Sequence, residues 1–305
     1  MSTEDRIIAR LLGDTPLPPP AGPGDDCALV PGDVAVSVDA MIEGIHFDHR
    51  LSPADVGWKL VAVNASDIGA CGRMPDWALL ALSLPRPLDP HWLESFSEGL
   101  QAALQHFGVR LIGGDTTSSP GPVCASLTIA SQPGGPFLTR SGGQAGDTLW
   151  VTGALGRAAA GFQHATPLGL QWLRRPLPPV KFGAALGRMG AVHAMMDLSD
   201  GLRRDLDRLC TASDCGALVY PERLPFDASV EGLSERLRLQ VAFGEDYQLL
   251  LSAPPASDGA LLDLAKSHRI RLTNIGTLTA NGGAMLSEGS WPKADFSHFG
   301  PATSS

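Results

Sequence analysis

One turn constrains this chain more than any other stretch: Met196-Asp197-Leu198-Ser199-Asp200-Gly201. Residues 194–196 have the apolar character of a buried strand's end, whereas leucines recur at helical spacing over 202–209. The turn therefore places two carboxylates and a hydroxyl group between a strand and a helix, with Gly201 relaxing the backbone. A single Asp in this position is commonly a helix cap.

Acidic residues recur in the same setting, beside glycine or at the end of an apolar run. They are Asp25-Asp26, Asp39, Asp67, Asp115, Asp197 with Asp200, and Glu245-Asp246. Two carboxylates about 4 Å apart repel by roughly 4 kcal/mol at an effective dielectric constant near 20. If these residues converge, several Mg²⁺ ions and phosphate groups are the ligands that suit them. Asp and Gly are also common turn residues, so each site has a structural alternative.

The predicted secondary structure alternates between strands and helices. Helices are expected at 3–12, from Ser52-Pro53-Ala54-Asp55 onward, from Asp89-Pro90 to Gly108, and at 181–189, 201–212, 229–238 and 258–268. Strands are expected at 27–30, 34–38, 77–84, 109–112, 122–131, 148–152, 194–196, 216–220, 249–251 and 271–278, with 164–180 as a connection. We expect Asp67 on the apolar face of the second helix, where an unpaired carboxylate is costly.

The length of 305 residues suits two domains. A glycine-rich polar stretch near 134–146 marks the predicted boundary, which gives an N-terminal domain at 1–140 and a C-terminal domain at 141–305. The fold class expected from these patterns is α/β, or α+β.

Composition and missing motifs exclude several classes of function. The net charge of −9 argues against nucleic-acid binding, and no apolar run approaches the roughly 20 residues that span a membrane. Five cysteines without a Cys-x-x-Cys pair, and an acidic N-terminus unlike a secretory signal, predict reduced thiols and a cytoplasmic location. The Gly-x-x-x-x-Gly-Lys-Ser/Thr, Gly-x-Ser-x-Gly and His-Glu-x-x-His motifs are absent.

The motifs, taken in order, resemble those of the thiamine-monophosphate kinase family, which shares a superfamily with aminoimidazole ribonucleotide synthetase and selenophosphate synthetase. The resemblance runs from about residue 4 to Phe299. It rests on Gly24-Asp25-Asp26-Cys27-Ala28, Ser37-Val38-Asp39, Glu43-Gly44-Ile45-His46-Phe47, Asn64-Ala65-Ser66-Asp67, Leu111-Ile112-Gly113-Gly114-Asp115-Thr116-Thr117, Thr139-Arg140-Ser141-Gly142, Asp197-Leu198-Ser199-Asp200-Gly201 and Gly244-Glu245-Asp246-Tyr247.

The resemblance implies a mixed-sheet N-terminal domain that pairs with a second copy in a dimeric, barrel-like sheet. It also implies direct transfer of the γ-phosphoryl group of ATP to thiamine monophosphate with Mg²⁺. The implied partners are these two substrates and a second subunit, with neither nucleic acid nor membrane.

The resemblance further implies roles for individual residues. The implied Mg²⁺ ligands are Asp26, Ser37, Val38 through its carbonyl, Asp39, Asp67, Asp115, Asp197 and Asp200. The implied ATP contacts are Phe107, Gly114, Asp115, Arg140 and Ser199, and the implied thiamine contacts are His46, Glu245 and Phe296. Catalysis is assigned to Asp67, Asp115 and Arg140.

Local alternatives and two departures stand beside these roles. Taken alone, His46 is a loop histidine, Phe107 a core residue and Arg140 a solvated loop charge. Val38 stands where the family usually has Thr, and Phe243 where it usually has Gly. Another ATP-using enzyme of the superfamily and a cation-binding regulatory protein are the rival functions. Many acids without a nucleophile dyad favour in-line transfer without a phosphoenzyme.

Overall fold

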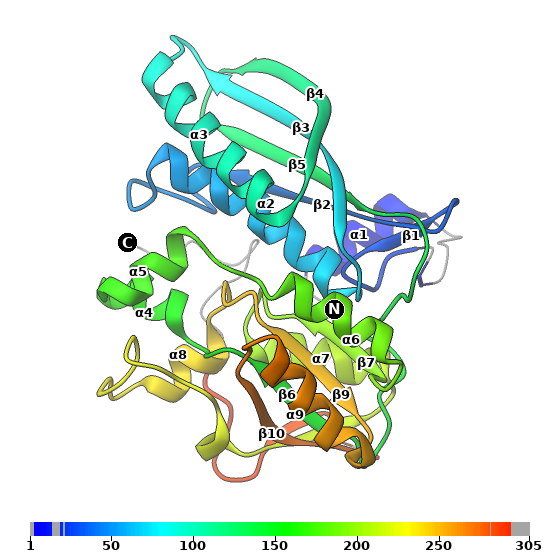
Figure 1. Cartoon of the computed structure of the whole chain (residues 1–305). Helices are drawn as coiled ribbons and strands as arrows, with labels where there is room; N and C mark the ends of the chain where they lie inside the picture. Colours follow the sequence, from blue (N-terminus) through cyan, green and yellow to red (C-terminus); the bar gives the residue numbers. More distant parts are fainter. Residues whose placement is uncertain (1–2, 14–18, 21, 281, 294–305) are drawn as a thin grey trace.

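The computed structural model describes residues 3–13, 19–20, 22–280 and 282–293. Two sheets, each packed against helices, form two bodies that meet along the helix α2 (Pro53–Ala70) (Figure 1). Within the described part of the chain, none of the helices combines the length and apolar character that a membrane crossing needs. All five cysteines are free thiols, as predicted.

The N-terminal body is a five-stranded sheet in the order β1-β2-β5-β3-β4. Only β3 and β4 run parallel, and the other neighbours are antiparallel. The helices α2 and α3 cover one face of this sheet (Figure 1). The elements are α1 (Thr3–Leu12), β1 (Ala28–Val30), β2 (Val34–Ile42), β3 (Pro75–Pro85), α3 (Pro90–Phe107), β4 (Arg110–Ser119) and β5 (Cys124–Ser131).

The strand register gives this sheet a covered face and an open face. Leu127 and Ile129 of β5 are buried beneath the helices, and their partners on β2 are Asp39 and Ser37. Since residues that pair across antiparallel strands project on the same side, both polar residues face α2. Val38 lies between them, points to the open face and is 59% exposed.

Two glycines let α2 and α3 pack with their backbones in contact. A side chain at Gly99 of α3 would overlap the Ala54 carbonyl oxygen, and one at Gly57 of α2 would overlap that of Phe96. The position of α2 is also fixed at its start, where Ser52 and Asp55 form a capping box. This close packing holds the far end of α2, and thus Asp67, at a fixed place.

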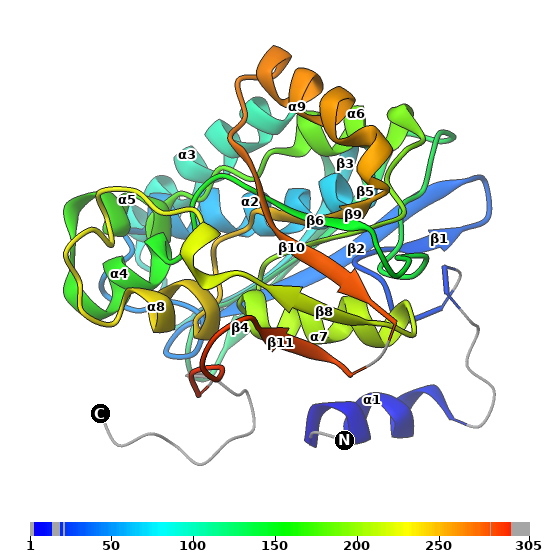
Figure 2. The same ribbon diagram turned by 90° about the horizontal axis from the view of Figure 1, so that it is seen from below.

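The C-terminal body is a six-stranded sheet in the order β11-β8-β10-β6-β9-β7. The helices α6 and α9 cover one face and α7 the other (Figure 2), while α4, α5 and α8 pack beside the sheet. The elements are β6 (Thr148–Thr152), α4 (Arg157–His164), α5 (Pro167–Arg174), α6 (Val180–Met189), β7 (Ala194–Asp197), α7 (Leu202–Ala212), β8 (Gly216–Val219), α8 (Arg236–Ala242), β9 (Leu249–Ala253), α9 (Asp258–Ser267), β10 (Leu272–Thr279) and β11 (Ala284–Leu286).

Most predicted elements are confirmed, and three predictions differ from the structure. The stretch Gly113–Thr117, expected to follow a strand, lies inside β4, because β4 pairs with β3 as far as Ser119. The connection at 164–180 contains α5, and the helix expected near 229–238 begins only at Arg236. The domain boundary at 140/141 stays a prediction.

We expect Gly99→Ala to lower the free energy of unfolding by about 1–3 kcal/mol, because the added methyl group must push α2 and α3 apart. Gly259→Ala is the matched control, since Gly259 also lies in a helix and has no neighbour within 4 Å of an added methyl group. This control should be neutral or stabilising by up to about 1 kcal/mol. Chemical denaturation of both variants measures the difference, and equal stabilities would refute the close-packing account.

Candidate active site

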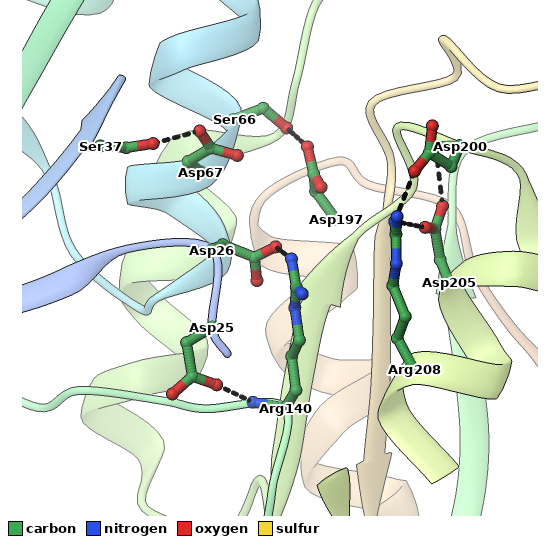
Figure 3. Close-up of polar contacts among 10 residues, drawn as sticks. All are labelled: Asp25, Asp26, Ser37, Ser66, Asp67, Arg140, Asp197, Asp200, Asp205 and Arg208. Atoms are coloured by element: carbon green, nitrogen blue, oxygen red, sulfur yellow. Dashed lines mark hydrogen bonds and ion pairs between the residues drawn. The ribbon is translucent and has the colours of Figure 1, made fainter. Parts of the chain in front are cut away.

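Three carboxylates from distant parts of the chain meet where the two bodies touch (Figure 3). Asp26 precedes β1, Asp67 lies near the end of α2, and Asp197 ends β7. One oxygen from each lies within 4.8 Å of an oxygen from the other two. We call these three residues the acid cluster. The structure thus brings the turn that begins at Asp197 into contact with the N-terminal body.

Each member of the acid cluster is held by a defined partner (Figure 3). The Ser37 hydroxyl donates to Asp67 at 2.5 Å, and the Ser66 hydroxyl donates to Asp197 at 2.6 Å. The Arg140 guanidinium donates to Asp26 at 2.6 Å. Because Ser66 and Asp197 belong to different bodies, their hydrogen bond ties the domains together at the cluster.

The electrostatics of the acid cluster disfavour three free negative charges. Burial, followed by the charges of Asp39 and Asp197, raises the pKa of Asp67 well above its usual value. Burial and the nearby charge of Asp26 likewise raise the pKa of Asp197. Burial raises the pKa of Asp26 too, although Arg140 opposes that change. A cation or protons must therefore accompany the cluster when it is fully formed.

The donor set of the acid cluster fits a hard divalent cation. Its ligands are carboxylate oxygens, which Mg²⁺ prefers together with water and phosphate oxygens. Beside it, Asp25 Oδ2 and Arg140 Nε are buried without a hydrogen-bond partner among the described residues. Unpaired buried polar groups are uncommon in folded proteins, so this pair marks the surroundings of the acid cluster as unusual.

Ser37 and Asp39 join the acid cluster from β2. Ser37 bonds directly to Asp67, and the backbone N–H of Asp39 donates to the Asn64 side chain on α2 at 2.9 Å. The charge of Asp39 is close enough to raise the pKa of Asp67. The Val38 side chain faces the opposite side of the sheet, away from the acid cluster, and the role of its carbonyl stays a prediction.

Asp115 is not brought to the acid cluster within one chain. It pairs with Ala81 on the open face of the sheet and is exposed on the edge strand β4. Gly114 lies against β3, since a side chain there would overlap the Leu80 carbonyl oxygen. Asp115 and the acid cluster thus occupy opposite faces of one sheet.

Asp200 is engaged by arginines of α7 rather than by the acid cluster. Its carboxylate pairs with Arg208 at 2.5 Å and with Arg204 at 3.8 Å. Arg208 also pairs with Asp205, a fully buried residue whose pKa burial raises to about 7 (Figure 3). Ser199 contributes its backbone carbonyl, which accepts the Glu245 N–H at 2.9 Å.

The remaining candidates occupy separate places. Glu245 pairs with Lys59 at 2.7 Å. His46 lies in the loop after β2, where its Nδ1 accepts the Ile42 N–H at 3.0 Å. Phe107 is buried and borders a cavity of about 270 Å³ that no member of the acid cluster lines. Phe296 lies outside the described residues.

Two matching family models cover most of the chain. The model of the AIR synthase related protein, N-terminal domain, matches residues 24–131, and that of its C-terminal domain matches residues 144–287. The thiamine-monophosphate kinase of Escherichia coli (strain K12) is 40% identical over 280 residues, which cover 85% of this chain and 84% of that protein. The chain belongs to the thiamine-monophosphate kinase family.

Solved structures of the thiamine-monophosphate kinase family share the whole fold. The structure of AaThiL complexed with AMPPCP and TMP has a TM-score of 0.83 at 27% identity and covers 97% of this chain and 96% of its own. Thiamine-monophosphate kinase from Stenotrophomonas maltophilia K279a has a TM-score of 0.78 at 35% identity, with coverage of 93% and 95%. The two-domain α+β class predicted from the sequence is therefore confirmed.

Three charged residues of this family member escaped the sequence analysis: Lys59, Asp205 and Arg208. Lys59 precedes Asp67 by eight residues, a spacing that keeps it near the same side of a helix. Asp205 and Arg208 follow the turn at helical spacing, but on a helix rich in arginine they resembled an ordinary solvated face.

We expect Asp67→Asn to raise the melting temperature at pH 8 by about 2–4 °C in buffer without divalent cations. Burial and negative neighbours raise the folded-state pKa of Asp67, so the folded wild type loses stability as pH rises from the unfolded pKa toward the folded one. Asn keeps no such charge. Mg²⁺ should raise the melting temperature of the wild type more than that of the variant.

Thermal unfolding with a chelator and with Mg²⁺ measures both effects. Asp263→Asn is the control, because this carboxylate is exposed on α9. It should respond to Mg²⁺ like the wild type. An identical Mg²⁺ response in Asp67→Asn would contradict a cation site at the acid cluster.

Proposed function

We propose that this chain transfers the γ-phosphoryl group of ATP to the phosphate of thiamine monophosphate and forms thiamine diphosphate. The observation that carries the proposal is the acid cluster, in which Asp26, Asp67 and Asp197 converge at the domain contact beside Arg140. Membership of the thiamine-monophosphate kinase family supplies the two substrates.

The main barrier to this reaction is the repulsion between two anionic phosphates. The acceptor oxygen is already charged and needs little deprotonation, so catalysis rests on positioning and charge neutralisation. The acid cluster, with Ser37, the Val38 carbonyl and Asp39, would hold Mg²⁺, which offsets phosphate charge when bound. The Arg140 guanidinium keeps its charge, because Asp26 raises its pKa despite burial.

We assign the nucleotide phosphates to the side of the acid cluster that Arg140 borders. The guanidinium of Arg140 supports this, since it is the cation that pairs with Asp26 of the acid cluster. Gly114, Ser199 and Phe107 remain proposed ATP contacts, and Asp200 remains a proposed metal ligand that must leave Arg208 to act as one.

We assign the thiamine moiety to Glu245, with His46 and Phe296 as further proposed contacts. The backbone of Glu245 bonds to Ser199, two residues beyond Asp197, so its side chain starts close to the acid cluster. A carboxylate suits the positively charged ring of thiamine.

We also propose a homodimer built on the open face of the N-terminal sheet, and a cytoplasmic location. Exposed apolar side chains on this sheet include Val30 at 37%, Val38 at 59%, Leu79 at 38% and Ile112 at 56%. The strand β4 is an exposed edge, which proteins usually cover. Asp115 shares this face, so a second copy would enclose it.

The proposed reaction predicts ADP release that depends on thiamine monophosphate and Mg²⁺, with free thiamine as an inactive control acceptor. Asp115 remains a proposed Mg²⁺ ligand, ATP contact and catalytic residue, which would act at the face that the second copy covers and not at the acid cluster of its own chain. On that assignment Asp115→Asn should lower kcat/KM by about 100-fold or more while the melting temperature stays unchanged. Asp76→Asn is the matched control, since Asp76 pairs with exposed Arg110.

Coupled ADP detection and chromatography of thiamine diphosphate measure this outcome. Direct transfer also predicts no labelled protein after mixing with γ-labelled ATP. A labelled phosphoprotein, or full activity of Asp115→Asn, would count against the proposed mechanism. ADP release without any acceptor would count against the proposed function.

The proposed dimer predicts that Leu79→Glu yields monomers, because a charge on the open face opposes its burial. Leu262→Glu is the control, since Leu262 is 46% exposed on α9, away from that sheet. Size-exclusion chromatography with light scattering gives the molar mass. A dimer that persists in Leu79→Glu would place the contact elsewhere.

A further inference from the structure

Lys59 is a buried cation at the contact between the two bodies. Its side chain is 2% exposed, and Nζ donates to Glu245 Oε2 at 2.7 Å. Burying an ammonium group costs free energy unless it is paired, so the bond to Glu245 accounts for its presence there. The Glu245 side chain is 26% exposed, so part of it remains accessible.

The backbone of Glu245 is fixed independently of Lys59. Its N–H donates to the Ser199 carbonyl, and its φ of 69° lies in the left-handed region. The preceding Gly244 packs so tightly on Ser199 that a side chain would overlap the carbonyl oxygen. The following Asp246 accepts the Gly156 N–H at 2.9 Å. Only the rotamers of the Glu245 side chain are left for Lys59 to fix.

The ion pair lies along one helix from the acid cluster. Eight residues of α2 separate Lys59 from Asp67, a rise of about 12 Å. Tyr247, a buried residue two positions after Glu245, also senses this acidic surrounding, because burial and then the charges of Glu245 and Asp39 raise the pKa of its hydroxyl. Lys59 and Glu245 therefore stand at one end of an acidic site whose other end holds Asp67.

We propose that Lys59 is a positioning residue for the acceptor substrate. Its bond to Oε2 fixes the plane of the Glu245 carboxylate, so that Oε1 meets the positively charged organic part of thiamine monophosphate while the acceptor phosphate lies at the acid cluster. This inference rests on the proposed function. Lys59 acts through Glu245 and touches no reacting atom.

A purely structural role in joining the two bodies does not explain the Lys59–Glu245 ion pair. The same helix already carries an interdomain ion pair between Asp55 and Arg175 at 2.6 Å, in which the Arg175 side chain is 45% exposed, and Trp58 donates to the Pro176 carbonyl at 3.1 Å. Such contacts join the bodies without the desolvation that a buried ammonium group requires. Arg175→Met therefore offers a matched control that breaks an ion pair of α2 outside the acceptor end.

The test is a double-mutant cycle with Lys59→Met, Glu245→Gln and the double variant in the full-length chain. Lys59→Met should raise the KM for thiamine monophosphate by about tenfold or more. Its kcat and its KM for ATP should stay within about twofold of the wild type. In the Glu245→Gln background the same change should add nothing, because Lys59 acts only through that carboxylate.

Two further variants keep the test decisive if Lys59→Met folds poorly. The double variant leaves no lone buried charge, and Lys59→Arg keeps the pair and should hold the acceptor KM within about threefold of the wild type. Arg175→Met should leave that KM unchanged. The inference would be overturned if Lys59→Met raised the KM for thiamine monophosphate by the same factor in the Glu245→Gln background as in the wild type. It would also be overturned if Lys59→Met raised the KM for ATP equally. If the wild type formed no thiamine diphosphate, that result would instead refute the proposed function.

Discussion

Mutual repulsion among clustered carboxylates is the constraint on which this structure depends. Asp26, Asp67 and Asp197 come from a loop, a helix end and a strand end, and their oxygens lie within 4.8 Å of one another. Such an arrangement is costly unless the scaffold holds it and a cation accompanies it. The scaffold holds the three carboxylates through hydrogen bonds from the hydroxyl groups of Ser37 and Ser66 and from the guanidinium of Arg140. The remaining negative charge favours a divalent cation, and in the proposed reaction that cation would offset the negative charge of the phosphate groups.

The helix α2 converts local packing into this geometry. Its first half is locked to α3 through Gly57, and its last turn lies against α6, where a side chain at Gly69 would crowd Val180. Between these contacts it presents Lys59, Ser66 and Asp67 to the C-terminal body. A helix fixed at both ends can hold Lys59 and Asp67 about 12 Å apart along its axis with little freedom. The packing that makes α2 rigid therefore also fixes the positions of its polar side chains.

The sequence predicted what local patterns determine and missed what tertiary pairing determines. Periodicity, capping residues and Gly108 located α3 to its ends, because those signals act within one helix. The position of Asp115 was wrong, since β4 continues through two glycines only because β3 provides a partner along its length. Lys59 and Arg208 gave no signal, because a lone basic residue on a helix reveals nothing of a carboxylate 186 or 8 positions away. The resemblance to a family supplied residue roles but not which face of the sheet each residue occupies.

The two departures from the family pattern gain a physical account from their places in the fold. The Val38 side chain points to the open face of the sheet, so a hydroxyl at 38 would not reach α2 and its loss leaves the acid cluster intact. Phe243 instead fills space: its ring lies 5.4 Å from that of Phe162, on which Arg50 stacks at 3.8 Å. It packs against both the N-terminal core and the cluster around α4 and α8. Because Glu245 follows two residues later, this packing lies beside the proposed thiamine contact rather than beside the acid cluster.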